Sequence, residues 1–264
     1  MNGDLSVGSI NGSGFSPTNL VINPEFTINQ RGAATRTTTS SAYNFDRWYY
    51  DGTNLLQGVE NNNLRATTYV ISWEGSSTCA YSLNTAAASG QGSESYTSVT
   101  NGGTITIASV GSNNLWLKFT SDLGNLNKVM LVQGTETSVF VARQYGTELA
   151  LCQRYLPAVS AVSGTNRPLP GIATALTTNV NLIFNHPVPA RVPGTGVAVS
   201  NSGHFQFSNN DGNTSSTAVS FGAGGTNATQ VVITVAVSRG ATTTPGWIYF
   251  NNASGILYIT GCEL

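Results

Sequence analysis

Short runs in which apolar and polar residues alternate recur along most of the chain, and clusters of Gly, Asn and Ser separate them. Alternation with a period of two is typical of a β-strand that buries one face. In one such run, Leu115, Leu117 and Phe119 share one face of the predicted strand. Trp116 and Lys118 lie on the opposite face. Many short strands at this spacing predict an all-β fold of the sandwich type.

One segment, residues 147–156, has the pattern of a helix and lies between Gly146 and Pro157. Thr147 can cap its first turn, and Glu148 suits the positive end of a helix dipole. One stripe of this helix carries its large apolar residues and a cysteine, namely Leu149, Cys152, Tyr155 and Leu156. The prolines that follow the segment are typical of a linker.

The helix and the linker divide the chain, so we predict two β-sandwich, jelly-roll-like domains joined by one short α-helix. Residues 1–18 are rich in Gly and lack an apolar period, which predicts a flexible amino-terminal docking arm. The first sandwich is expected at 19–146. The helix and linker are expected at 147–164, and the second sandwich at 165–264.

The second predicted domain is poor in charge. Between residue 157 and the carboxyl end, the charged residues are Arg167, Arg191, Asp211, Arg239 and Glu263. The run 230–237 is almost wholly apolar, which predicts a strand that is buried on both sides or lies at an interface. We therefore expect sister chains to cover much of residues 165–264, as in a homotrimer.

Composition excludes several classes of function. Charged residues make up 9% of the chain and the net charge is −1, so no basic field favours nucleic acid or an anionic membrane surface. No apolar run approaches the ~18 residues of a spanning helix, and the start of the chain does not resemble a signal peptide. Three widely spaced cysteines support neither a disulfide framework nor a zinc site, so we expect buried small apolar residues there.

The residues that catalysis requires are scattered. His186 and His204 have no carboxylate or cysteine at ligand spacing. Asp46 and Asp51 flank an aromatic run, but the simpler interpretation is a hydrogen-bonded strand start and the turn after the strand. We therefore expect no enzyme, no cofactor and no metal centre, although weak calcium binding by Asp- and Asn-rich loops stays open.

Aromatic side chains on predicted strands offer another kind of site. Exposed rings stack against sugars, and strand alternation places Trp116 away from Leu115 and Leu117. Trp247 and Tyr249 form a similar outward pair near the carboxyl end. These three rings are the candidate glycan-binding residues. The alternative is that they lie in the core or at a subunit interface, which is the commoner place for large rings.

Several ordered blocks of the sequence resemble a known family. The segments 19–32 and 43–48 are similar to the opening of carbohydrate-binding-module-like β-sandwiches in bacteriophage virion proteins, especially tail fibres. The segment 128–155 resembles the end of that module, with its Gly-x-Glu-Leu turn and Leu-Cys-Gln-Arg-Tyr helix. The segment 257–264 resembles the closing strand of a second domain. The family's Pro-Phe-Glu-x-Arg sequence is altered at 139–143, where the proline and the glutamate are missing.

The resemblance implies a role for the residues in the first two blocks. It assigns six of them to the framework rather than to binding: Asn23, Pro24, Phe26, Asp46, Arg47 and Trp48. It also implies a structural protein of a phage virion, made in the host cytoplasm and displayed on the virion surface. Such a tail-fibre or receptor-binding component would recognise host surface polysaccharide and would contact other virion proteins through residues 1–18.

Two other interpretations remain. A capsid decoration (cement) or head-fibre protein without a receptor role would bury its aromatic rings against capsid or sister chains, whereas a receptor binder would keep an exposed aromatic rim. A depolymerising tailspike is the weakest interpretation, because the chain lacks β-helix repeats and a persuasive pair of acids.

Overall fold

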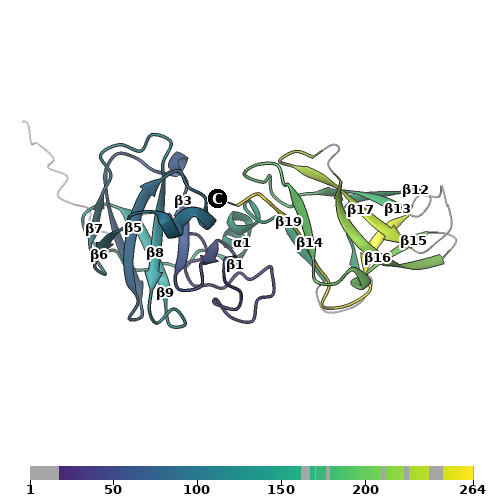
Figure 1. Ribbon diagram of the computed structural model, residues 1–264, viewed down its shortest axis with the longest axis horizontal. Helices are drawn as coiled ribbons and strands as arrows, with labels where there is room; N and C mark the ends of the chain where they lie inside the picture. The colour runs from purple at the N-terminus through teal and green to yellow at the C-terminus, as the bar shows by residue number, and fades with distance from the viewer. Residues whose placement is uncertain are drawn as a thin grey trace, which may run out of the picture.

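The chain has an all-β fold, as the alternation predicts. A computed structural model describes residues 18–161, 167–169, 171–176, 179–209, 212–222, 226–237 and 246–263. Within this part, the chain forms four antiparallel sheets and a single α-helix, α1 (Tyr145–Gln153). Figure 1 shows two β-rich lobes side by side along the long axis, with α1 and the carboxyl end of the chain between them. No helix in the described ranges has the length and apolarity that a bilayer span needs.

The first lobe (residues 18–144) packs two sheets around one core. The six-stranded sheet has the order β1 (Ala42–Phe45), β2 (Trp48–Tyr50), β3 (Leu55–Val59), β8 (Asn114–Thr120), β5 (Thr78–Asn84) and β6 (Thr97–Val99). The three-stranded sheet has the order β7 (Thr104–Thr106), β4 (Thr68–Glu74) and β9 (Asn127–Gln133). Two short 3-10 helices, η1 (Asn61–Asn63) and η2 (Ala88–Ser93), complete the lobe. Leu117 and Leu131 contribute from opposite sheets to the core between them, and both are fully buried.

The second lobe (residues 158–263) repeats this plan. Its seven-stranded sheet has the order β11 (Arg167–Pro168), β18 (Trp247–Phe250), β15 (Phe205–Asn209), β16 (Gly212–Gly222), β17 (Gln230–Val237), β13 (Asn179–Asn185) and β12 (Gly171–Leu176). The smaller sheet has the order β10 (Ala158–Ser160), β19 (Ile256–Thr260) and β14 (Gly196–Val199). A 3-10 turn, η3 (Ser202–His204), precedes β15. Phe207 and Leu257 meet from the two sheets in a core separate from that of the first lobe.

The apolar strand β17 buries one face only. Ile233 and Val235 lie in the core of the second lobe and are fully buried, while Val232 and Ala236 between them are half-buried on the outer face. Within the chain the run is therefore not buried on both sides, and the alternative, that its outer face lies at an interface, stays a prediction. Its apolar inward positions are explained by the sandwich itself, and the expected homotrimer stays a prediction.

The helix begins earlier than predicted. It starts at Tyr145, so Thr147 lies inside the first turn and is not the cap. Glu148 and Cys152 form its buried face, and Tyr155 packs beside Cys152 from the turn that follows. The loop residues Ile22 and Ile28 cover this face from the first lobe. Helix α1 is therefore anchored to the first lobe by its buried side.

The segment after the helix is more ordered than a linker. Residues 158–160, which the sequence assigns to a linker, form β10 and pair with one edge of β19. That edge provides hydrogen-bond partners for an extended segment, which explains the extra strand. The rest of the predicted linker, 162–164, and the docking arm up to residue 17 lie outside the described residues.

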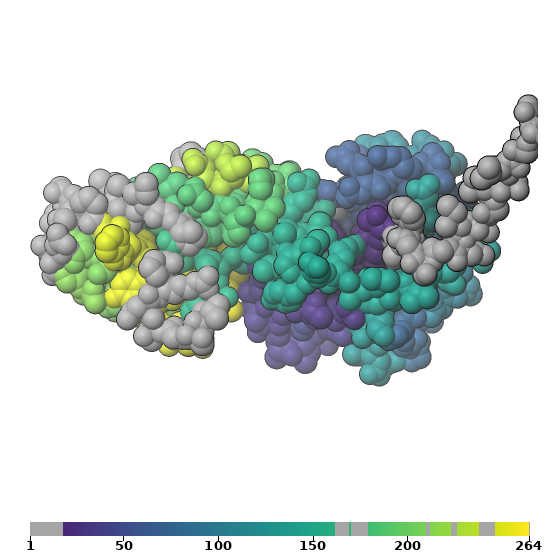
Figure 2. Space-filling view, turned by 180° about the vertical axis from the view of Figure 1, so that it is seen from behind, coloured from purple at the N-terminus to yellow at the C-terminus, as the bar shows by residue number. Residues whose placement is uncertain are grey.

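Polar contacts hold the lobes together at the junction around α1. Arg31 of the first lobe and Glu263 of the second are 2.7 Å apart, and both side chains are mostly buried. Arg191 of the second lobe lies 3.6 Å from Glu60 of the first, and its backbone N–H donates to the carbonyl of Arg154 at 2.7 Å. The space-filling view shows the segment around α1 filling the space between the two lobes (Figure 2).

Candidate functional site

Trp116 does not form an exposed platform. Its side chain is fully buried and packs with Tyr49, Leu56 and Ala88. Strand alternation places Trp116 on the face opposite Leu115, but the 3-10 helix η2 and neighbouring tyrosines cover that face. The prediction that this ring is available to stack on sugar is therefore corrected, because a second apolar cluster forms on the outer side of the sheet.

The other two predicted rings have different environments. Tyr249 lies outside the core cluster that holds Ile248 and Phe250, but it is only 6% exposed and its hydroxyl donates to the side chain of Gln206. It is therefore covered and does not offer an exposed ring. Trp247 is 63% exposed at the start of β18. It is the one predicted glycan ring that the isolated chain presents to solvent among the residues described.

The six predicted framework residues are all buried. The Asn23 carboxamide donates to the backbone carbonyls of Ile28 and Asp46 at 2.8 and 3.0 Å, and its oxygen accepts the Ile28 N–H at 2.9 Å. The backbone carbonyl of Asn23 accepts the Trp48 indole N–H at 2.9 Å. The Phe26 ring stacks on Trp48 with centroids 4.7 Å apart. Asn23 has a φ of 55°, a left-handed conformation that asparagine adopts more readily than most residues. The loop therefore depends on this side chain.

Glu148 connects the opening block to the helix block. Its carboxylate accepts the Asn23 backbone N–H at 2.5 Å and lies 2.9 Å from Arg143 Nη1. Arg143 also donates to the Val21 carbonyl at 3.0 Å. In the family that the chain resembles, the Pro-Phe-Glu-x-Arg sequence has a glutamate at the position of Val141. Val141 is 60% exposed. The altered sequence is thus accommodated at the surface while the buried Arg143 contact is kept.

A second set of buried charges meets where the carboxyl end reaches the first lobe. Arg31 lies between Asp46, at 3.5 Å, and Glu263, at 2.7 Å. The rings of Tyr43 and Tyr258 flank the Arg31 guanidinium, each 5.5 Å away. Burial raises the pKa of Asp46 and of Glu263, and the attraction of Arg31 opposes this rise. This convergence is not visible in the sequence, because its members come from distant segments.

Arg47 is held by a ring rather than by an acid. Its guanidinium stacks 3.6 Å from the centre of the Tyr155 ring and donates to the carbonyl of Gly58. Tyr155 in turn donates its hydroxyl to Glu60 at 2.9 Å. Burial also raises the pKa of the Cys152 thiol well above its usual value. These groups form a packed framework, and their chemistry is structural.

A groove lies on the outer face of the six-stranded sheet, the face that carries Trp116 and Lys118. Lys118 lines the groove. The groove encloses about 690 Å³, and its lining includes four hydroxyl-bearing residues from β5, β6, the residue after β6, and β8: Thr78, Ser98, Thr100 and Thr120. Ala80 forms part of the lining, between Ser98 and Lys118 in the strand register. The Lys118 ammonium sits 3.8 Å from the centre of the Tyr96 ring. Sequence alternation correctly placed Lys118 on this face but did not indicate Tyr96.

The remaining polar candidates are accounted for locally. Asp51 Oδ1 accepts the backbone N–H groups of Thr53 and Asn54, so it shapes the turn after β2 as predicted. His204 hydrogen-bonds Ser200, and His186 Nδ1 contacts the carbonyl of Ala228 at 3.0 Å. All three cysteines are buried and free of disulfides, which confirms the sequence interpretation: Cys79, Cys152 and Cys262. Within the described ranges, no three His, Cys, Asp or Glu side chains gather as metal ligands would.

Comparison with protein-family models, curated sequences and solved structures gives no match to the chain.

Proposed function

We propose that the chain is a structural protein of a bacteriophage virion that recognises glycan on the host surface. The observation that carries this proposal is the meeting of the resembling blocks at one junction. Asn23, Asp46 and Glu148 come from three of those blocks and share one buried hydrogen-bond system. Glu263, from the carboxyl-terminal block, reaches the same region through Arg31. Blocks that belong to one framework are expected to meet in this way.

The groove beside Tyr96 and Lys118 is the proposed recognition surface. Sugars present hydroxyl groups at their rim, which pair with Ser and Thr side chains, and the groove lining is rich in both. The half-buried Tyr96 ring offers an apolar surface at its edge, and Lys118 adds a donor. Trp247, on the other lobe, is a further exposed ring for contact with a long polysaccharide.

Assembly is part of the same proposal. Two β-sandwich, jelly-roll-like domains would be displayed on the virion as a homotrimer, with the carboxy-terminal domain at the subunit interface and residues 1–18 docking to other virion proteins. The half-buried outer positions of β17, such as Val232 and Ala236, are candidate interface residues. Native mass spectrometry of the isolated protein should show a trimer, and a stable monomer at micromolar concentration would count against this part.

The location is tested by immunogold electron microscopy of purified virions with antibody against the chain. Gold at the tail tip together with binding of the protein to host cells supports the proposal. Gold over the capsid without cell binding supports the alternative of a decoration or head-fibre protein. Absence of the chain from virions refutes both.

The groove is tested by filling it. Ser98 is exposed on the edge strand β6 and lines the groove, so Ser98→Trp blocks it without removing a core side chain. Thr106 is exposed on β7, an edge strand of the other sheet, and Thr106→Trp is the matched control. Cell binding should be lost only in Ser98→Trp. Equal binding by both variants would exclude the groove as the recognition surface.

A further inference from the structure

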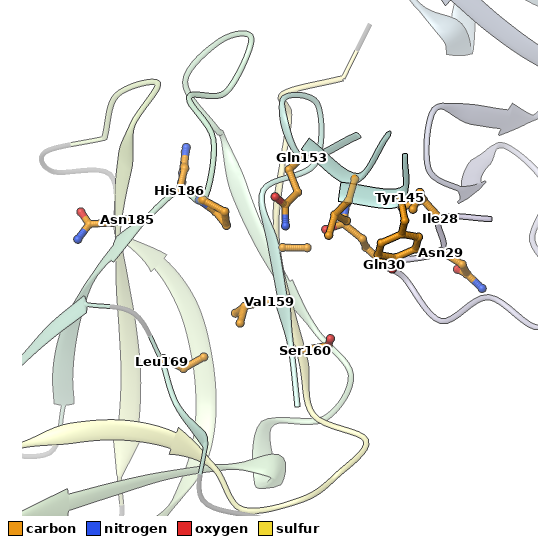
Figure 3. A pocket seen from close by; sticks show the side chains of 13 residues that line it. Ile28, Asn29, Gln30, Tyr145, Gln153, Val159, Ser160, Leu169, Asn185 and His186 are labelled. Carbon is orange, nitrogen blue, oxygen red and sulfur yellow. The ribbon is translucent and has the colours of Figure 1, made fainter. Parts of the chain in front are cut away.

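A second cavity lies at the junction of the two lobes, away from the groove. It measures about 820 Å³, within the usual range of small-molecule sites. One wall is built by the loop 28–30 and by Tyr145 and Gln153 of α1, and the other by Leu169, Asn185 and His186 of the second lobe. Figure 3 shows the two walls facing each other, with Val159 and Ser160 of β10 between them.

The polar side chains of the described lining residues are neutral. Gln30 and Gln153 bring carboxamides from two different segments, and a carboxamide both donates and accepts hydrogen bonds. The Asn185 carboxamide points away from the facing wall (Figure 3). His186 Nδ1 lies 3.0 Å from the Ala228 carbonyl, so this nitrogen carries the proton and Nε2 is an acceptor. Nε2 is buried and has no hydrogen-bond partner within the part of the chain that the structure describes. Burial also lowers the pKa of His186, which keeps the ring uncharged near neutral pH.

The apolar part of the lining is equally distinct. Ile28, Leu149 and Val159 contribute aliphatic surface, and Tyr145 presents a ring that is 64% exposed at the mouth of the helix wall. Among the lining residues that the structure describes, none is an acid, an arginine or a lysine, so a charged ligand would find no ion-pair partner among them. A sugar combines an apolar C–H face with hydroxyls that donate and accept, and therefore matches both parts of the lining.

We infer that the junction cavity is a second binding site and that its ligand is a short neutral oligosaccharide. One sugar ring would stack on Tyr145, while hydroxyl groups would bond the carboxamide of Gln153 on one wall and Nε2 of His186 on the other. The biological meaning of this site rests on the proposed recognition of host glycan. Binding itself does not, because it is a property of the isolated chain.

The test uses the full chain and a panel of neutral trisaccharides built from glucose, galactose, rhamnose or N-acetylglucosamine, measured by saturation-transfer NMR and calorimetry. At least one trisaccharide should bind. Tyr145→Ala, Gln153→Ala and His186→Ala should each weaken that binding about tenfold or more. Val141→Ala is the matched control, since Val141 is also 60% exposed but lies outside the cavity and should leave binding unchanged.

Three results would overturn the inference: no trisaccharide in the panel binds, the three cavity variants bind as well as the parent chain, or an acidic trisaccharide displaces the neutral one. The outcome is separate from that of the proposed function. Loss of cell binding in Ser98→Trp with no effect of the cavity variants would leave the groove and remove this site. Trisaccharide binding that depends on Tyr145, in a protein absent from virions, would do the reverse.

Discussion

Replacing Glu148 by alanine should destabilise the first lobe strongly. Its carboxylate is the partner of both the buried Asn23 N–H and the Arg143 guanidinium, and its side chain is 6% exposed. Removing one member of a buried ion pair leaves the other charge without compensation, at a cost of about 3–5 kcal/mol. The Asn23 amide also loses its acceptor. The loss is a large part of the roughly 5–15 kcal/mol by which a domain is stable.

Urea unfolding followed by tryptophan fluorescence measures this effect in the right lobe. Three of the four tryptophans are buried in the first lobe, namely Trp48, Trp73 and Trp116. The matched control is Glu74→Ala, which breaks the surface pair of Glu74 with Lys128, whose side chains are 56% and 38% exposed. An exposed pair is screened by water, so this variant should unfold almost like the parent. The reasoning is refuted if the two variants lose similar stability, or if Glu148→Ala costs less than about 1 kcal/mol.

Other outcomes follow from burial and charge. Trp116→Ala should cost about 3–5 kcal/mol, as much as Trp48→Ala, and a mild effect on the urea midpoint would contradict the buried position of Trp116. Because burial raises the pKa of Glu263 above its ordinary 4.5, the stability it contributes is lost as the pH rises from about 4.5 through the folded value. Glu263→Gln should therefore remove this part of the pH dependence of the urea midpoint, whereas an unchanged profile would refute it. The thiols should resist Ellman's reagent at pH 8 until the protein is unfolded, since burial raises the pKa of Cys79 to about 12 and that of Cys262 to about 11.

The sequence predicts strands better than it predicts what covers them. Alternation in β8 correctly separated Leu115 and Leu117 from Trp116, because side-chain direction depends only on the local backbone. The fate of the second face depends on η2, in which Ala88 lies far from Trp116 in the sequence and close to it in space. A pattern within one strand carries no information about such a cover. The same limit applies to Tyr249, because the alternation in its strand does not show that the ring is covered.

The helix illustrates a smaller error of the same kind. The sequence pattern predicts a helix over residues 147–156, whereas α1 runs from Tyr145 to Gln153. A Thr is a good cap, but Thr147 lies inside the helix because the tertiary contacts of Glu148 with Asn23 and Arg143 fix where the first turn sits. The apolar stripe was right about Cys152, since this side chain faces the first lobe in any register near the observed one.

The junction was not predictable from spacing. Arg31, Glu60, Arg191 and Glu263 come from segments far apart in the sequence, and the pairs Arg31–Glu263 and Arg191–Glu60 form only when both lobes are folded. In a chain with 9% charged residues, several charges are thus placed between the lobes. Buried pairs have a geometry that specifies one arrangement, so they orient the lobes rather than attract ligands. The described surfaces that remain present hydroxyls, carboxamides and rings, and these groups suit the neutral glycan partner that we propose.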